Sequence, residues 1–476
     1  MNPSKKSRNP LVNLGRNIAL FFYSIAASIG NFFKILIKGD FKTKLSFIFM
    51  GFGNLLRGQI VRGLLYLGIQ VGYIAYMIGF GWNYLKNIAT LGTATRIKVW
   101  NEELEIFEYI QGDNSMKILL FSVVSIVISI VFLVFYVKNI KSAYEAELLS
   151  KSGKKLPSAK DDFNALFNER FHVTMLSVPT IMIISFTILP IIFMVCIAFT
   201  NFDKNHQPPG NLFTWIGFDN FNNMLFKDKI QKDTLVNIFT WTMVWAFFAT
   251  FLNYIFGMIL AMIINKKGIK LKSMWRTFFV ITIAVPQFVT LMLMSKLFAD
   301  QGPVNSILMN LGVINENIQF LTDTSSQLPR IMCILINMWV GIPYTMLITT
   351  GILMNIPEEM YESARIDGAN PVVMFTKITL PYMLFITTPY LITQFVGNIN
   401  NFNVIYLLTA GGPLSLDYYQ AGKTDLLVTW LYKLTVNEQN YSIASTIGIF
   451  VFAITAILSL IVYNMSASSK REDQFK

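Results

Sequence analysis

Amide and aromatic side chains gather on two apolar stretches in the second half of the chain. The first stretch carries Asn337, Trp339 and Tyr344 around Gly341 and Pro343. The second carries a dense group of amides, at Gln394, Asn398, Asn400, Asn401 and Asn403. Amides donate and accept hydrogen bonds without carrying a charge, and aromatic rings pack on the C–H face of a pyranose. This combination suits a neutral, hydroxyl-rich ligand such as a sugar.

A structural role is the alternative interpretation of these amides. Polar side chains in membrane helices often hydrogen-bond to a neighbouring helix and hold a bundle together. One or two amides would fit that role, but the segment 394–403 has five amides in ten residues, spread over most faces of a helix. We therefore expect this segment to line a water-filled cavity.

The sequence offers little for covalent chemistry. Cys196 and Cys333 lie inside apolar runs, and His172 and His206 are isolated, so no disulfide framework, metal site or catalytic set is indicated. Gly422-Lys423-Thr424 resembles the end of a phosphate-binding loop, but the position where that motif requires its first glycine is Asp. We expect no enzyme activity, no metal and no nucleotide bound by this chain.

Composition places the chain among membrane proteins, because 54% of its 476 residues are hydrophobic and only 14% are charged. Runs without Asp or Glu that are long enough to cross a bilayer cover residues 63–85, 117–139, 173–200, 236–264, 276–298, 330–355, 382–407 and 442–465. An ion-coupled carrier is one possible function of such a protein, but the absence of a carboxylate from these runs argues against it. We predict an all-α polytopic membrane protein with eight transmembrane helices.

Charge placement predicts the orientation. Residues 1–62 hold ten Lys or Arg against one acid, the loop 86–116 is acidic, and the following loop is basic again. Cytoplasmic loops of membrane proteins carry an excess of Lys and Arg. The formal net charge of +12 therefore reports topology and not a nucleic-acid partner. We expect a multi-pass protein of the plasma membrane with both termini in the cytoplasm.

The N-terminal region is expected to lie at the membrane surface. Polar residues recur at helical spacing over 17–38, which predicts an amphipathic helix in contact with lipid headgroups and not a signal peptide. The apolar segment 45–59 is too short for a span and is interrupted by glycine, so we expect a re-entrant or interfacial turn there.

One polar segment, residues 357–381, stands between two of the apolar runs. Pro357 and the acids after it suit a helix start, Gly368 suits a helix end, and Asn370 with Pro371 can begin a second helix. We expect two short cytoplasmic helices, followed by a new span that starts at Pro381. We call residues 357–381 the coupling segment. It is more acidic than the other inner loops, which favours a basic protein partner over lipid headgroups. The alternative is a plain linker.

The spacing in the coupling segment resembles the EAA loop of bacterial ATP-binding-cassette import permeases. The matching positions are Glu362, Ser363, Ala364, Asp367, Gly368, Ile378 and Pro381. The resemblance implies a type I importer permease fold in which this loop docks on a separate ATPase subunit. ATP and Mg would then be bound by that partner, with no cofactor in this subunit.

From residue 172 to the end the chain is similar to the larger permease of maltose and maltodextrin importers, on the segments 337–344, 398–402 and 407–413. The resemblance implies a sugar site at Asn337, Val340, Gly341, Tyr344, Gln394, Gly397, Asn398 and Asn401. Val340 stands where the enterobacterial relative has Leu, which is a mild change. Gln394 and Gly397 stand where that relative has Ser and Phe, so the sugar can differ. The outer loop 201–235 is also much shorter than the folded insert of Gram-negative members, which implies a lipid-anchored sugar-binding protein.

The sequence thus predicts three parts: a cytoplasmic and interfacial region 1–62, a two-helix membrane extension 63–172, and a permease core 173–476. The expected function is inward transport of an oligosaccharide, with maltodextrin as the first substrate and galacto-oligosaccharide as the second. The expected partners are a second homologous permease, two ATPase subunits and the extracellular binding protein. A membrane anchor for an assembly is the remaining alternative.

Overall fold

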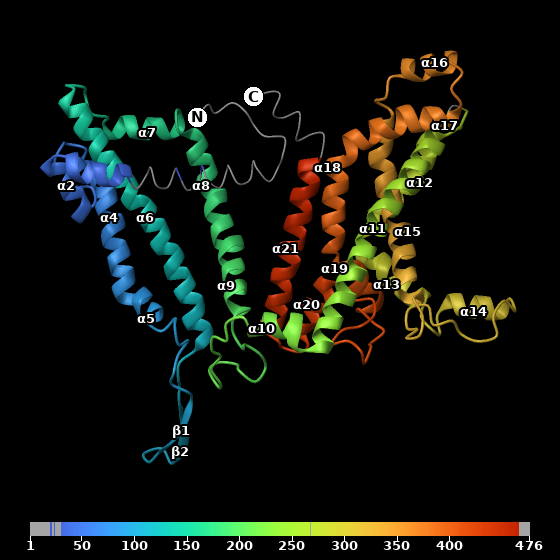
Figure 1. Ribbon diagram of the computed structural model, residues 1–476, viewed down its shortest axis with the longest axis horizontal. Coiled ribbons are helices and arrows are strands. Elements are labelled where there is room, and N and C mark those ends of the chain that lie inside the picture. The colour runs from blue at the N-terminus through green and yellow to red at the C-terminus, as the bar shows by residue number, and fades with distance from the viewer. Residues whose placement is uncertain (1–19, 21–22, 24–29, 267, 466–476) are drawn as a thin grey trace. The chain divides into compact units, whose positions relative to one another are not determined.

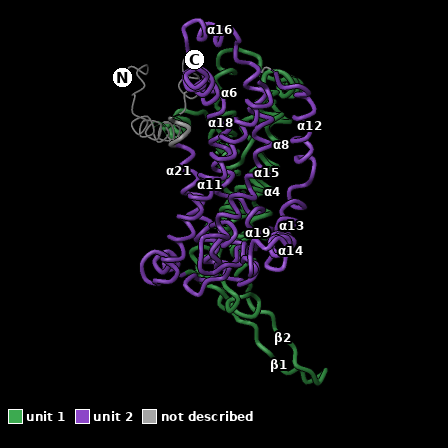
Figure 2. The backbone as a smooth tube through the Cα atoms, turned by 90° about the vertical axis from the view of Figure 1, so that its right-hand side faces the viewer, with its two compact units in different colours: residues 1–215 green, residues 216–476 purple. Residues whose placement is uncertain are grey.

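A computed structural model describes residues 20, 23, 30–266 and 268–465. The chain forms two compact units, residues 1–215 and 216–476, coloured green and purple in Figure 2. The amphipathic helix predicted over 17–38 lies mostly outside the described residues, although its last part, 30–38, is helical. The domain boundaries predicted at 62 and 172 stay predictions.

The first unit consists of helices and one hairpin. Its elements are α2 (Phe41–Ile48), α3 (Phe52–Leu55), α4 (Ile60–Tyr76), α5 (Trp82–Leu85), β1 (Ile97–Asn101), β2 (Ile106–Ile110), α6 (Ser115–Lys151), α7 (Ala159–Phe167), α8 (Phe171–Ile183) and α9 (Leu189–Ile197). A π-helical turn joins α4 to α5 and another joins α8 to α9, so each pair is one continuous apolar rod. The short helices α2 and α3 occupy the segment predicted as an interfacial turn.

A buried polar cluster fixes α2 and α3 against α6. Asp40 caps α2 by accepting a hydrogen bond from the Thr43 N–H, and Arg57 donates to both Asp40 carboxylate oxygens. The Arg57 side chain is 4% exposed and also lies 3.9 Å from Glu147 on α6. Burial opposes ionisation of Asp40, but the hydrogen bonds from Arg57 and Thr43 win and lower the pKa of Asp40 to about 2.

The hairpin β1–β2 lies at the end of α4 and α6 opposite to α2 and α7 (Figure 1). Its base is clamped because Asp113 Oδ2 accepts hydrogen bonds from the N–H groups of Thr93 and Ala94. These two bonds lower the pKa of Asp113. Within this unit the acidic loop and the basic loop therefore fall at opposite ends, as the charge pattern predicted.

The second unit is a helical bundle. Its elements are α10 (Asp219–Asn222), α11 (Lys229–Asn265), α12 (Lys272–Ala284), α13 (Gln287–Leu297), α14 (Pro303–Asn310), α15 (Leu328–Leu353), α16 (Glu358–Ile366), α17 (Pro371–Met374), α18 (Leu380–Ile399), α19 (Phe402–Thr409), α20 (Leu427–Val436) and α21 (Tyr441–Met465). The long helix α11 packs on both α15 and α18, and its Trp241 and Trp245 are buried in the core. Figure 1 shows α16 and α17 at one end of this bundle and α14 and α20 at the other.

The predicted spans hold with two differences. In the described part of the chain, seven helices are long and apolar enough to cross a membrane, or eight if one bent pair counts as a span. That pair is α12 and α13, which meet at 86° across Val285 and Pro286, so the run 276–298 is not one straight helix. Proline lacks the N–H that would continue α12, and it fixes the turn that starts α13.

The second difference concerns the ends of the run 382–407. Asn400 and Asn401 end α18 and start α19, so the run is not one helix. At its other end the backbone is helical without a gap from Pro371 to Ile399, through a π-helical turn at Phe375–Thr379. The prediction that the span starts afresh at Pro381 is therefore wrong, because proline is tolerated in the first turn that it occupies in α18.

A tight loop follows α19 at the end of the bundle away from α16. Ala410 and Gly411 both have positive φ, at 49° and 80°. A Cβ at Gly411 would overlap the carboxylate of Asp425, which is fully buried and accepts hydrogen bonds from the Gly422 N–H and Lys433 Nζ. Burial raises the pKa of Asp425 although Lys433 opposes the shift. Gly411 is therefore required for the close approach of loop and carboxylate.

Candidate functional site

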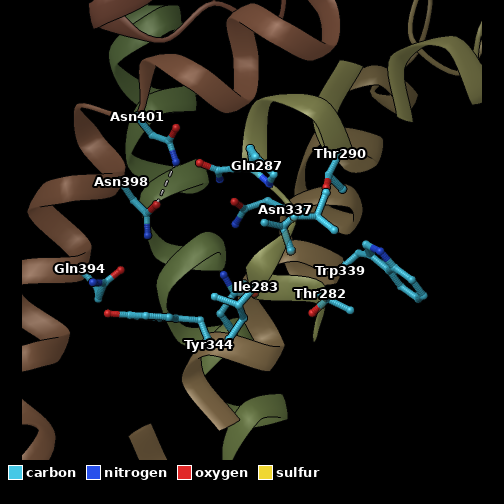
Figure 3. Close-up of a pocket in the computed structure, with 15 residues that line it drawn as sticks. Thr282, Ile283, Gln287, Thr290, Asn337, Trp339, Tyr344, Gln394, Asn398 and Asn401 are labelled. Atoms are coloured by element: carbon cyan, nitrogen blue, oxygen red, sulfur yellow. Dashed lines mark hydrogen bonds between the residues drawn. The ribbon is translucent and has the colours of Figure 1, made fainter. Parts of the chain in front are cut away.

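A cavity of about 540 Å³ opens in the second unit. Four of its polar side chains come from α15 and α18, which the sequence singled out, and more come from α11, α12 and α13 (Figure 3). The complete lining is Asn253, Thr282, Ile283, Val285, Pro286, Gln287, Thr290, Asn337, Trp339, Val340, Gly341, Tyr344, Gln394, Asn398 and Asn401. All of these side chains are uncharged, so the cavity presents amides, hydroxyls and two aromatic rings.

The structure brings together seven of the eight positions predicted for the sugar site. These are Asn337, Val340, Gly341, Tyr344, Gln394, Asn398 and Asn401. Gly397 does not line the cavity, although it lies on α18 between Gln394 and Asn398, and the space around its Cα is open. Gln394 and Asn398 are four residues apart and share a face of α18, and Asn401 joins them from the start of α19.

The amides on α18 have two roles. Asn398 donates from Nδ2 to Thr250 Oγ1 on α11 at 3.0 Å, and it accepts a hydrogen bond from Asn401 at 3.3 Å. Asn401 is also the N-cap of α19 and accepts the Val404 N–H at 3.2 Å. An amide nitrogen carries two hydrogens, so each of these residues keeps one N–H for a ligand. Asn398 and Asn401 thus hydrogen-bond within the bundle and also line the cavity.

Asn337 is the most enclosed polar residue of the cavity wall. Its side chain is 5% exposed, and Nδ2 has no hydrogen-bond partner among the described residues. A buried polar group without a partner costs about 1 to 3 kcal/mol relative to one that is satisfied. A bound hydroxyl that accepted this N–H would remove that cost, so the position favours a hydroxylated ligand.

Gly341 contacts a residue that the sequence did not single out. A Cβ on Gly341 would lie 2.3 Å from Nδ2 of Asn253 on α11. The glycine is therefore needed to make room for the Asn253 amide.

Sequence reasoning missed several lining residues on α11, α12 and α13. These residues are Asn253, Thr282, Gln287 and Thr290, which stand well apart from one another or beside Pro286 and form no dense polar group. The signal that the sequence offers is Pro286, one of five prolines within the predicted runs, each of which favours a bend. The bend itself turns Gln287 and Thr290 into the cavity.

The coupling segment has the predicted helix ends and caps, although its second helix continues into α18. Pro357 is the N-cap of α16, and Glu358 and Glu359 occupy its first turn, where they complement the helix dipole. Gly368 ends the helix with φ at 79°, and Asn370 caps α17 by accepting the Val373 N–H at 2.9 Å. The residues predicted to contact an ATPase follow α16 and its end: Glu362, Ser363, Ala364, Asp367 and Gly368, with Ile378 and Pro381 further on.

The surface of the coupling segment is open and partly apolar. Ile366 is 87% exposed and Val372 is 68% exposed, each beside charged or polar neighbours. A hydrogen bond ties α16 to the π-helical turn that follows α17, because the Tyr361 hydroxyl lies 2.9 Å from Thr379 Oγ1. Exposed aliphatic side chains on a rigid, capped element are typical of a surface that another protein covers.

Comparison with known proteins identifies a family. Residues 253–471 match the family described as "binding-protein-dependent transport system inner membrane component". The chain is 33% identical to the galactooligosaccharides transport permease GanP of Bacillus subtilis (strain 168), over 89% of this chain and 97% of that protein. It is 33% identical to the maltodextrin transport permease MdxF of the same strain, over 92% of this chain and 98% of that protein.

A solved structure supports the same fold. A chain of a bacterial ABC transporter that imports alginate aligns with a TM-score of 0.51 at 23% identity, covering 65% of this chain and 98% of that chain. The all-α bundle agrees with this alignment. The predicted type I importer permease fold is therefore confirmed, and the chain belongs to the inner-membrane permease family of binding-protein-dependent ABC importers, as the membrane subunit that leaves ATP hydrolysis to a separate ATPase.

Proposed function

We propose that this permease subunit imports a neutral oligosaccharide of the maltodextrin type. The observation that carries the proposal is the cavity of about 540 Å³, whose lining offers amides, hydroxyls and aromatic rings and no charged side chain. Sugar hydroxyls need partners that both donate and accept, which amides supply. A volume in this range holds a small oligosaccharide segment.

The relatives support the substrate class. Full-length relatives are maltodextrin permeases of Bacillus subtilis and Streptococcus pneumoniae, at 33% and 31% identity. A galactooligosaccharide permease is equally similar, at 33%. Galacto-oligosaccharide is therefore the second candidate substrate, because it presents the same kinds of hydroxyl groups to the same amides.

Partner subunits complete the importer. We place an ATPase on α16 and α17, where Ile366 and Val372 are exposed and the acids of α16 can meet a basic surface. A second homologous permease would close the open side of the cavity, because amides facing lipid would be costly. ATP and Mg belong to two ATPase subunits, and a lipid-anchored binding protein would deliver the sugar from outside.

The bundle gives a route from ATP to sugar. Helices α15 and α18 flank the coupling segment and also carry the main lining residues of the cavity. A rigid-body movement of α16 and α17 would therefore tilt both cavity walls together. Alternating access needs only this shared movement, which opens the cavity to one side at a time.

Reconstitution of the complex in proteoliposomes tests the proposal. The complete importer, with its own partner subunits and binding protein, is given maltotriose, β-1,4-galactotriose or glutamine. We expect maltotriose to stimulate ATP hydrolysis and to be transported, with galactotriose the second-best substrate. Stimulation by glutamine alone would overturn the assignment to sugars, and a preference for galactotriose would select the second candidate.

A further inference from the structure

A second, smaller cavity lies behind the sugar cavity. It has a volume of about 50 Å³ and is lined in part by Thr345, Tyr390 and Leu391. Along α15 and α18 these residues are nearer to the coupling segment than Asn337 and Asn398 are. The small cavity therefore lies between the main cavity and the end of the bundle that carries α16. It is large enough for ordered water.

The two cavities share four lining residues: Asn253, Gly341, Tyr344 and Gln394. These four residues, which we call the ring, line both cavities and so lie where the two adjoin. Tyr344 and Gln394 were predicted from the sequence, whereas Asn253 was not.

Asn253 interrupts a seam of small residues between α11 and α15. Ala249, Gly257 and Ala261 recur at four-residue spacing with it, and these two alanines are at most 1% exposed. A Cβ at Gly257 would lie 2.7 Å from Thr345 Cβ, so the two helices are in close contact there. An amide in such a seam has space only because Gly341 has no side chain.

The Asn253 amide is incompletely satisfied. Its Oδ1 is buried and has no hydrogen-bond partner in the part of the chain that the structure describes. Nδ2 of Asn337, a buried donor without a partner among the described residues, belongs to the same cavity wall. One unpaired acceptor and one unpaired donor on one wall match the two-way hydrogen bonding of a sugar hydroxyl.

We propose that Asn253 is a specificity-determining residue of the transport site. Its amide, held in place by Gly341, closes the deep end of the sugar cavity and hydrogen-bonds the terminal sugar residue that reaches it. Asn253 thereby fixes how far the oligosaccharide enters and selects the hydroxyls of that terminal residue. This inference rests on the proposed function, because it assumes an oligosaccharide in the main cavity.

The first experiment measures specificity with the reconstituted importer. Three probes are used: maltotriose, its reduced form maltotriitol, and maltotriose lacking the 4-hydroxyl of its non-reducing end. Asn253→Ala fits the alanine and glycine seam, so the complex should assemble. We expect its transport KM for maltotriose to rise about threefold to tenfold, the loss of one hydrogen bond. Discrimination against one of the two modified probes should fall as well.

A merely structural role for Asn253 predicts another pattern. The KM values for all three probes would then rise by the same factor, or would not change, and either result overturns the proposal. If the wild-type importer transports none of the three probes while its ATPase is active, the proposed function fails instead. The two failures are thus distinguishable.

The second experiment tests the contact without any sugar. Gly341→Ala should push a methyl group into the Asn253 amide and lower the Tm of the purified complex. In the Asn253→Ala background the same substitution meets empty space, so the Tm should be largely restored. An equal decrease of Tm in both backgrounds would show that the Gly341 methyl acts on another neighbour, and would remove Asn253 from the ring.

Discussion

At the scale of single residues, the amides of this permease combine structure and recognition. Asn398 joins α18 to α11 through Thr250, and Asn401 starts α19, yet both face the cavity. A bond that holds a side chain in one rotamer also preorganises its remaining N–H for the ligand. Substitution of such a residue therefore affects stability and transport together, and the two effects have to be separated.

Asn401 allows that separation. Serine at position 401 can still cap α19 but cannot donate an amide N–H to Asn398, whereas alanine does neither. We expect Asn401→Ala to lose about 1 kcal/mol of stability through the missing cap. Asn401→Ser should keep the wild-type Tm, and both variants should transport maltotriose several-fold more slowly, by up to about tenfold. A slow Asn401→Ala with a normal Asn401→Ser would reduce the role of Asn401 to capping.

Asp40 makes the stability of the first unit depend on acid. Its pKa is lowered from 3.8 to about 2, so its ionised form stabilises the fold at every pH above 3.8. That contribution is lost as the pH falls from 3.8 through 2, because the bonds to Arg57 need the carboxylate. The Asp40 side chain is 34% exposed, so solvent weakens its interactions, and we expect its ionised form to contribute about 1 to 2 kcal/mol to the free energy of unfolding.

Asp40→Asn is the matching variant. It should lower the Tm of the detergent-solubilised protein at pH 7, and it should flatten the decrease of Tm between pH 4 and about pH 2. The measurement is a series of thermal unfolding curves against pH. An Asp40→Asn protein whose Tm decreases with acid as steeply as that of the wild type would assign the acid sensitivity to other groups.

Residue types predicted the site only where they were dense. Five amides within 394–403 stood out against an apolar run, so Asn398 and Asn401 were found. Asn253 is one of four amides spread along the 37 residues of α11, and amides so far apart form no pattern that separates a ligand contact from a helix contact. Its importance follows from Gly341, which is 88 positions away in the sequence and adjacent only in the fold.

At the scale of elements, the coupling segment was predictable because its structure is local. Pro357, Gly368 and Asn370 act on backbone groups within a few residues. Their positions in the sequence therefore predict where α16 begins and ends and where α17 begins. The break between α12 and α13 was not predictable in the same way. Proline occurs within α15 and α18 without ending either helix, and only packing decides which proline breaks a span.

Gly368 offers a test of the coupling segment. Its φ is 79°, and a Cβ there would meet no atom within 4 Å, so a side chain adds backbone strain and no clash. We expect Gly368→Val to cost about 1 to 2 kcal/mol locally and to misalign α16 with α17. Transport should fall sharply, or ATP hydrolysis should become independent of sugar, while the amount of subunit in the membrane stays normal.

Gly153 is the matched control. It has φ at 69° and equally open surroundings, but it lies between α6 and α7 in the first unit. Gly153→Val should carry the same strain without uncoupling ATP hydrolysis from transport. Equal uncoupling by both variants would mean that strain alone is responsible, and normal transport by Gly368→Val would exclude the segment from the mechanism.

At the scale of the whole molecule, each unit has chemically different ends. In the first unit the hairpin turn carries Glu102, Glu103 and Glu105, whereas the stretch after α6 carries Lys154 and Lys155. In the second unit α16 and α17 lie opposite to α14. Because cytoplasmic loops carry an excess of Lys and Arg, we predict that the lysine-rich end and the coupling segment lie in the cytoplasm.

Cysteine labelling tests this orientation. In a background with Cys196→Ser and Cys333→Ala, single substitutions Glu105→Cys, Gln301→Cys and Lys270→Cys put a thiol at exposed positions. We expect an impermeant maleimide to label the first two variants in intact cells and Lys270→Cys only after the membrane is permeabilised. Labelling of Lys270→Cys in intact cells would invert the topology.

The bend between α12 and α13 has a consequence for the energetics of transport. The carbonyl end of one helix and the amide end of the next meet at Val285 and Pro286, beside the cavity, so their opposite partial charges largely cancel. No charged side chain lines the cavity among the described residues. A membrane voltage does work of about 2.3 kcal/mol per 100 mV on each unit charge that crosses, and none on a neutral sugar. Sugar import should therefore be electrically silent, with a rate that stays constant when valinomycin and potassium set the voltage of the proteoliposomes to different values.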